Sequence, residues 1–210
     1  MLGRKLGAGR AMVVGLGVKD ALGALMLPDD AQLVSPLTEA PVACVDVRRL
    51  GREAREARRL LVVDNTLPSW AGCAAVRLGA HLSVEPLAED VTLIGIAKDV
   101  GFEVPGLPPV DDDVAARLHA TLSDRERAWR AASDAAQVVA TYLVCHPHVG
   151  EVRYPGLKQD ACFEISARTL TGGFGPFVDY RLQGEKAWHR LSMASDADPR
   201  TEILHLESLL

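Results

Sequence analysis

The sequence predicts an α/β protein, with a three-layer domain followed by a small α+β C-terminal subdomain. The main observation is the continuous apolar run 60–63, which ends at the turn formers Asp64-Asn65-Thr66. A short apolar run of this kind predicts a strand buried on both faces, as in parallel sheets. Directly before it, arginines and glutamates interleave over residues 48–59. That pattern predicts a solvent-exposed helix with i,i+4 ion pairs, which Asp46 can cap.

The other elements of the first domain follow from apolar spacing and turn formers. The strands that we expect here lie at 31–36, 41–47, 60–63, 81–84 and 91–97. The expected helices lie at 16–26, 48–59 and 69–78, the last ended by Gly79. The last two strands are expected to form a hairpin that turns at residues 88–90. A stretch rich in Pro, Gly and acid, 103–113, predicts a linker and the best domain boundary.

The second half is expected to begin with two helices. Asp113 can cap a short helix through residue 122, and Ser123-Asp124-Arg125-Glu126 is a capping box that opens a second helix to Val144. Further on, we expect strands at 149–157, 177–182 and 201–210 and helices at 163–170 and 185–193. The chain is therefore divided into an α/β part (1–122), a connecting helix (123–144) and a C-terminal subdomain (145–210).

Composition excludes several classes of partner. With 23 basic and 28 acidic residues, a net charge of −5, the chain has no general attraction to nucleic acid or an anionic membrane. Lys19 and Asp20 interrupt the most apolar stretch, so no membrane span is expected. The four cysteines are scattered without a CxxC pair, which favours reduced thiols in a cytoplasmic protein and no zinc site.

Three motifs, in order along the chain, resemble those of one enzyme family. They are VVDNT (62–66) followed by LGA (78–80), HPHVGEVRYPGL (146–157) and TLTGGFGPFVDYRL (169–182). Together they resemble the Cys/Met-metabolism enzymes dependent on pyridoxal phosphate (PLP), the cystathionine γ-synthase group. The resemblance implies a reduced type I PLP-transferase-like fold in which residues 1–122 correspond to the cofactor domain.

The resemblance also implies roles for single residues. Asp64 stands where the family pairs an Asp with the pyridinium nitrogen of the cofactor, and Thr66 belongs to the same motif. The glycine-rich segment before residue 18 stands where the family has a helix whose N-terminus holds the cofactor phosphate. A longer family stretch, with a tyrosine that stacks on the cofactor ring, has no counterpart before VVDNT.

The lysine that a PLP enzyme needs is missing from its expected place. Counted without a gap from Asp64, the family's SxTK run falls on Pro86-Leu87-Ala88-Glu89. A carboxylate at Glu89 cannot form an imine. Lys98 is the alternative lysine, although an ordinary hairpin would place it at the opposite end of the sheet from Asp64. The family's RLSVG strand, which carries the substrate-carboxylate arginine, has its nearest counterpart in LHLES, at His205.

Other site candidates are weaker alternatives. Gly15 and Gly17 begin a dinucleotide-binding pattern, but Asp20 stands where its third glycine should be. His146 and His148 lack further ligands at metal spacing, so no metal is expected. Glu85 and Glu89 could form a carboxylate pair, but the neighbouring turn formers favour solvent exposure.

The sequence therefore predicts a degenerate cystathionine γ-synthase-like pseudoenzyme with a binding or assembly role, no catalytic residue and no covalent PLP. The alternative is a PLP-binding enzyme of sulfur amino-acid metabolism that uses another lysine or a full-length partner. We expect a homodimer, formed through the face around VVDNT and the apolar helix after it, or a complex with a full-length homologue.

Overall fold

The computed structural model describes residues 9–101, 106 and 112–210, and only the backbone of residues 112–123. The chain divides into two compact units. Unit 1 contains residues 1–36 and 46–123, and unit 2 contains residues 37–45 and 124–210. The expected linker 103–113 falls almost entirely outside the described residues.

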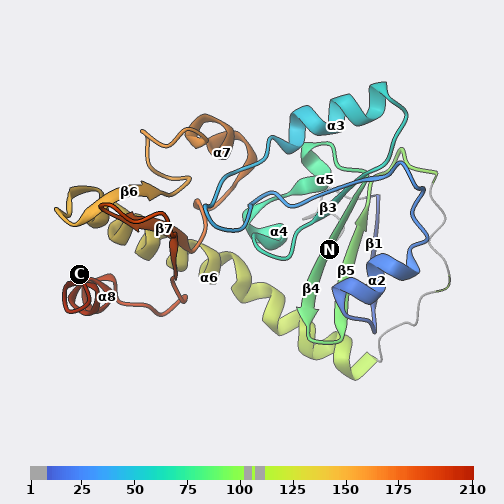
Figure 1. Ribbon diagram of the computed structural model, residues 1–210. Helices are drawn as coiled ribbons and strands as arrows, with labels where there is room; N and C mark the ends of the chain where they lie inside the picture. The colour runs from blue at the N-terminus through green and yellow to red at the C-terminus, as the bar shows by residue number, and fades with distance from the viewer. Residues whose placement is uncertain (1–8, 102–105, 107–111) are drawn as a thin grey trace. The chain divides into compact units, whose positions relative to one another are not determined.

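Unit 1 is built on a five-stranded mixed sheet in the order β1-β5-β4-β3-β2 (Figure 1). Its strands are β1 (Arg10–Val14), β2 (Gln32–Val34), β3 (Leu61–Asp64), β4 (Leu82–Ala88) and β5 (Val91–Ile96). The strands β2, β3 and β4 run parallel, while β5 is antiparallel to both β4 and β1. The predicted strand over residues 60–63, parallel and buried on both faces, is confirmed as β3, whose residues 61–63 are completely buried.

Short helices cover this sheet. They are α2 (Val18–Ala24), α3 (Val47–Glu56), α4 (Ser69–Gly72) and α5 (Ala75–Leu78). Ala21 and Leu25 share one core cluster with Val62, Val84 and Ile94. Since side chains alternate along a strand, the equally buried Leu61 and Val63 point to the other face, and β3 contacts α3. The predicted layered α/β class is confirmed.

The cap and the ion pair predicted for α3 are present. The Asp46 carboxylate accepts a hydrogen bond from the Arg49 N–H at 2.9 Å, and Arg49 pairs with Glu53 at 3.0 Å. Gly79 ends α5 with φ +112°, a value that favours glycine. The single helix expected over 69–78 is instead two short helices, because the chain is extended at Cys73.

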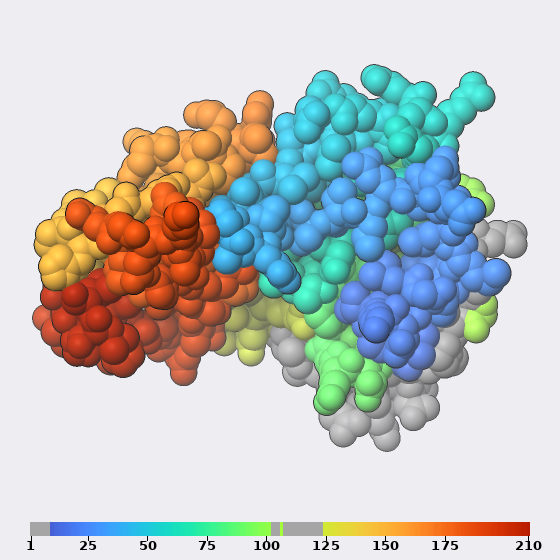
Figure 2. Space-filling model, in the orientation of Figure 1, coloured from blue at the N-terminus to red at the C-terminus, as the bar shows by residue number. Residues whose placement is uncertain are grey.

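Unit 2 contains a three-stranded antiparallel sheet in the order β6-β7-β8. Its elements are the described C-terminal part of α6 (Asp112–Cys145), β6 (Val149–Arg153), α7 (Phe163–Thr169), β7 (Phe177–Leu182), β8 (His189–Ser192) and α8 (Pro199–Glu207). Its core joins Val139 and Leu143 of α6 to Val178 of β7 and Leu206 of α8. The blue stretch 37–45 lies against the orange residues of this unit (Figure 2).

Two expectations about elements in the middle of the chain are wrong. Residues 41–47 form no strand, only an isolated bridge between Leu37 and Cys44, because this segment packs in unit 2 instead of the main sheet. The backbone of α6 is continuous from Asp112 to Cys145. No new helix therefore begins at Ser123, since a Ser-x-x-Glu sequence is also tolerated inside a helix.

In the tail, the expected helix is a strand and the expected strand is a helix. Residues 189–192 form strand β8, which pairs with β7, and residues 199–207 form helix α8. The signals for this helix were present in the sequence. Asp198 caps it by accepting from the Arg200 N–H at 3.2 Å, and Pro199 occupies its first turn. Among the described ranges, no helix combines the length and the apolar character needed to cross a bilayer.

Candidate functional site

The carboxyl ends of the parallel strands β3 and β4 lie at one edge of the unit 1 sheet, where Asp64 is paired with Val84. Asp64 is half-buried. Its Oδ1 accepts hydrogen bonds from the backbone N–H of Thr66 at 3.0 Å and from the Thr66 hydroxyl at 2.5 Å. The two residues singled out by the VVDNT motif are therefore engaged with each other, in a turn that ends β3.

A second carboxylate at this edge is buried, which corrects the sequence expectation. Glu85 is 1% exposed and accepts from the Trp70 N–H at 2.5 Å and from the Asn65 amide at 3.3 Å. The residue before Trp70, Ser69, has φ +51°, so the backbone is in the left-handed region where it meets this carboxylate. Glu85 thus fixes the segment between β3 and α4.

Glu89 lies in the turn between β4 and β5. Ala88 pairs with Val91, so Glu89 and Asp90 alone connect the two strands, and both are exposed. The turn also lies against the start of α2 (Figure 1). A Cβ added to Gly17, the N-cap residue of α2, would lie 3.3 Å from the Glu89 backbone oxygen.

These residues do not fit PLP. Glu89, the position that the resemblance aligns with the imine-forming lysine, holds a carboxylate, and a phosphate at the start of α2 would meet the Glu89 carbonyl oxygen and Asp20 of the first helical turn. The register Leu82–Ile96 places Lys98 beyond the opposite edge of the sheet from Asp64, as the hairpin predicted. Lys19, which the sequence reasoning did not weigh as an amine, is exposed on the first turn of α2.

Unit 2 carries a buried ion pair that the sequence reasoning missed. Asp179 on β7 is 0% exposed and receives two hydrogen bonds of 2.8 Å from the guanidinium of Arg190 on β8. The Val42 N–H donates to the same carboxylate at 2.5 Å. Hydrogen bonding to Asp179 raises the pKa of Arg190.

The position of Arg190 corrects the assignment of His205. His205 is exposed on helix α8, so LHLES is not a strand. The letters Arg190-Leu191-Ser192 lie on strand β8 and repeat the start of the RLSVG motif, which was the signal for this site. The guanidinium of Arg190 is bound by a carboxylate of the same chain.

The histidine pair before β6 contacts the end of the described chain. His148 Nδ1 lies 2.6 Å from the Leu210 backbone oxygen, and the His146 and His148 rings meet edge-on at 5.4 Å. Among the residues described, no group of three or more His, Cys, Asp or Glu side chains could hold a metal ion. None of the four cysteines is in a disulfide; Cys145 is exposed and the others are buried.

Comparison with known proteins identifies similar enzymes, although no family model matches the chain. It is 29% identical to cystathionine γ-synthase of Mycobacterium tuberculosis over 91% of this chain and 52% of that protein. Its identity to the Escherichia coli cystathionine γ-synthase is also 29%, over 87% of this chain and 51% of that protein. The chain thus spans about half the length of these curated relatives.

Solved structures of this group share the fold. Cystathionine γ-synthase from Xanthomonas oryzae, in complex with aminoacrylate and cysteine, matches 88% of this chain and 64% of its own with a TM-score of 0.71 and 19% identity. A methionine γ-lyase from Micromonospora echinospora matches 98% of this chain and 82% of its own with a TM-score of 0.74 and 16% identity.

We expect Asp64 to act as a hydrogen-bond acceptor, not as a charge. Asp64→Ala should lower the free energy of unfolding by about 1 kcal/mol, because the turn loses its acceptor. Asp64→Asn should lower it by less than about 0.5 kcal/mol, because an amide oxygen can still accept from Thr66. Urea denaturation measures both, with the exposed Glu89→Gln as the control. Equal losses in the two Asp64 variants would contradict this role.

The Asp179–Arg190 pair should be far more important for stability than an exposed pair. Asp179→Asn should cost about 3 kcal/mol, since it leaves a mostly buried guanidinium without its counter-charge. The matched change at the exposed pair Arg49–Glu53, Glu53→Gln, should cost less than about 0.5 kcal/mol. Chemical denaturation of both variants gives the comparison, and costs that agree within error would show that Asp179 is not needed as a charge.

Proposed function

Because the chain is a cystathionine γ-synthase-like member of the PLP-dependent transferase fold, we propose that it is a degenerate member that forms no covalent bond to PLP. It acts in the cytoplasm by binding or assembly, not by catalysis. The observation that carries the proposal is Glu89, a carboxylate in a two-residue turn at the position aligned with the imine-forming lysine. When bound, the cofactor supplies an electron sink, which needs a lysine and an acid at the ring nitrogen.

Three further contacts support the same conclusion. Asp64 accepts from Thr66 within its own turn. The carbonyl oxygen of Glu89 approaches the N-cap of α2, where an anion would need free N–H groups. In unit 2, Asp179 binds the guanidinium of Arg190 in the bidentate way that a substrate carboxylate would otherwise use.

A PLP-dependent enzyme of sulfur amino-acid metabolism is the second candidate. The names of the relatives favour it, since they are cystathionine γ-synthases and a putative cystathionine γ-lyase. It would require another lysine or a full-length partner that supplies one. Lys98 is unsuited because it lies beyond the other edge of the sheet.

Reduction with borohydride in excess PLP separates the two candidates. We expect intact-mass and peptide spectra without a stoichiometric pyridoxyl-lysine adduct. We expect the same of Glu89→Lys, because the Glu89 carbonyl oxygen and Asp20 still oppose a phosphate at α2. A stoichiometric adduct in the unmodified chain would refute the proposal. An adduct only in Glu89→Lys would show that the lysine alone has been lost. A full-length cystathionine γ-synthase is the positive control.

We further propose that the protein assembles as a two-fold homodimer or with a full-length homologue. The expected contact through the helix after VVDNT finds little support, because Trp70 is 5% and Ala71 is 8% exposed. The edge strand β2 is a better candidate, since among the described residues no strand pairs with one side of its backbone, and Leu33 is 53% exposed.

Light scattering at micromolar concentration tests this assembly. We expect a mass near twice the 22.5 kDa of one chain. Leu33→Glu should reduce it to one chain, whereas Val138→Glu on α6, at a side chain of similar exposure (47%), should not. A mass of one chain that does not rise with concentration would exclude the homodimer.

A further inference from the structure

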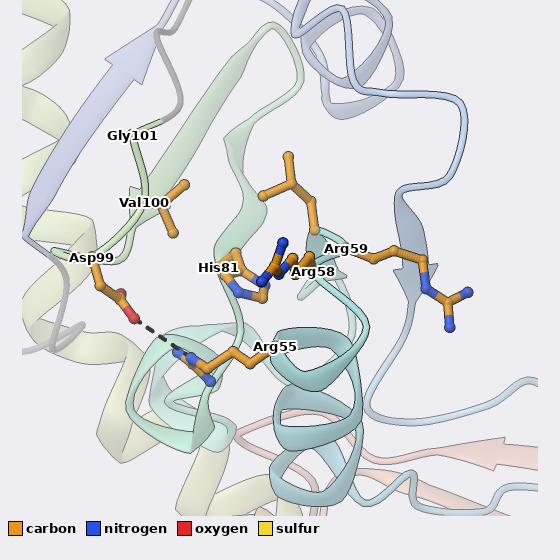
Figure 3. A pocket seen from close by; sticks show the side chains of 8 residues that line it. Arg55, Arg58, Arg59, His81, Asp99, Val100 and Gly101 are labelled. Atoms are coloured by element: carbon orange, nitrogen blue, oxygen red, sulfur yellow. Dashed lines mark hydrogen bonds and ion pairs between the residues drawn. The ribbon is translucent and has the colours of Figure 1, made fainter.

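Unit 1 has a pocket at the edge of the sheet opposite to Asp64. Its volume is about 420 Å3, and it lies at the amino ends of β3 and β4 (Figure 3). Its lining comes from the end of α3, the turn into β3, the start of β4 and the segment after β5: Arg55, Arg58, Arg59, Leu60, His81, Asp99, Val100 and Gly101. Arginines outnumber carboxylates in this set, which favours an anionic ligand.

His81 offers the pocket a hydrogen-bond donor. The side chain is buried, and its Nδ1 accepts from the Leu61 N–H at 2.8 Å. An accepting Nδ1 carries no proton, so in the neutral ring the proton is on Nε2. Burial, and next the charge of Arg55, lower the pKa of His81, while Asp99 opposes this. No acceptor for the Nε2–H is found among the described residues, so it is available in the pocket.

Arg58 has a backbone conformation that is unusual for its side chain. It follows the C-cap residue of α3 with φ +53°, in the left-handed region where helices usually place glycine. A residue other than glycine costs about 1 kcal/mol there. The side chain of Arg58 has no carboxylate partner among the described residues, and it lines the same pocket as His81. In Figure 3 the guanidinium of Arg59 extends away from His81.

Arg55 is fixed beside these two groups. Its guanidinium donates to the Gly79 carbonyl oxygen at 2.9 Å and pairs with Asp99 at 3.4 Å. Both side chains of this ion pair are largely exposed, 40% and 62%, so the pair is weak and an incoming anion can compete with Asp99. Leu60 and Val100 add apolar surface to the wall of the pocket.

We propose that this pocket binds the phosphate group of a small metabolite, with the Arg58 guanidinium and the His81 Nε2–H as donors and Arg55 adding positive charge. A phosphate accepts several hydrogen bonds at once and suits the planar fork of an arginine. Leu60 and Val100 contact the carbon skeleton of the ligand. The site is independent of the absence of covalent PLP, because it lies at the other edge of the sheet.

Titration of the full chain with inorganic phosphate at constant ionic strength, followed by calorimetry and by NMR of the His81 ring, tests the proposal. We expect saturable binding with a Kd on the order of millimolar, and about tenfold weaker binding in Arg58→Gln. Arg48→Gln removes the same charge from the start of α3, outside the pocket, and should change Kd less than about twofold.

Two additional measurements keep the result decisive. Arg58→Gly removes the guanidinium and suits the positive φ, so it should remain folded and still lose phosphate binding. Acetate should bind at least about tenfold more weakly than phosphate if the pocket recognises phosphate. The proposal is overturned by the absence of saturable binding, by equal losses in Arg58→Gln and Arg48→Gln, or by acetate binding as tightly as phosphate.

Discussion

The direct connection between β4 and β5 determines what the carboxyl edge of the unit 1 sheet can hold. Ala88 and Val91 are already paired, so the connection contains only Glu89 and Asp90. The hairpin also fastens the segment before α2, because the Thr92 hydroxyl donates to the Leu16 carbonyl oxygen at 2.7 Å. The β4–β5 turn and the segment before α2 therefore lie against each other at the carboxyl ends of the strands, where a doubly wound sheet usually binds its ligand. Asp64 and Glu85, the carboxylates at this edge, accept hydrogen bonds from neighbouring residues of the same chain.

Each unit has a buried carboxylate that accepts hydrogen bonds from other parts of the chain. Glu85 accepts from the Trp70 N–H, and Asp179 accepts from the Val42 N–H and from Arg190. A carboxylate removed from water needs such donors, because an unpaired buried charge costs several kcal/mol (about 3 or more). Each carboxylate accepts one backbone N–H from outside its own strand, 15 residues away for Glu85 and 137 residues away for Asp179. The carboxylates thus join segments that no regular sheet or helix pairing would join.

Local patterns in the sequence were sufficient for four of the five strands of the unit 1 sheet, but β1 (Arg10–Val14) was not expected as a strand. The buried strand β3, the Asp46 cap, Gly79 and the β4–β5 turn follow from short-range rules that need no partner. The segment 41–47 was misassigned because most of it packs in unit 2. In the tail, pairing with β7 makes residues 189–192 a strand, and packing in the core of unit 2 favours a helix at residues 199–207. Ile203, Leu206 and Leu210 have helical spacing and pack in this core, although the sequence analysis expected residues 201–210 to form a strand.

For the candidate sites too, short-range sequence patterns predict positions but not contacts with distant residues. The motif identified Asp64, Thr66 and Glu89 by position, but not the partners that engage them. Glu85 was assigned to solvent because its neighbours are turn formers, whereas the backbone of α4 covers it. Arg190 could have been found from the letters RLS alone. The pocket of Arg58 and His81 could not, because its lining comes from four separate segments that the parallel β3–β4 pairing and the antiparallel β4–β5 pairing bring together.

The crossing of residues 37–45 from the first unit to the second has a consequence for synthesis. Leu37 and Val42 are buried, and apart from the segment 37–45 itself their unit consists of residues that come after residue 123. During translation this short segment leaves the ribosome before all of residues 46–123, and it has no docking surface until the C-terminal part follows. Unit 2 therefore cannot be completed from one contiguous stretch of chain. In a nascent chain the apolar segment 37–45 therefore stays unpacked until the C-terminal part is made. Unit 1 has to fold from two stretches of chain that are separated by a segment of unit 2.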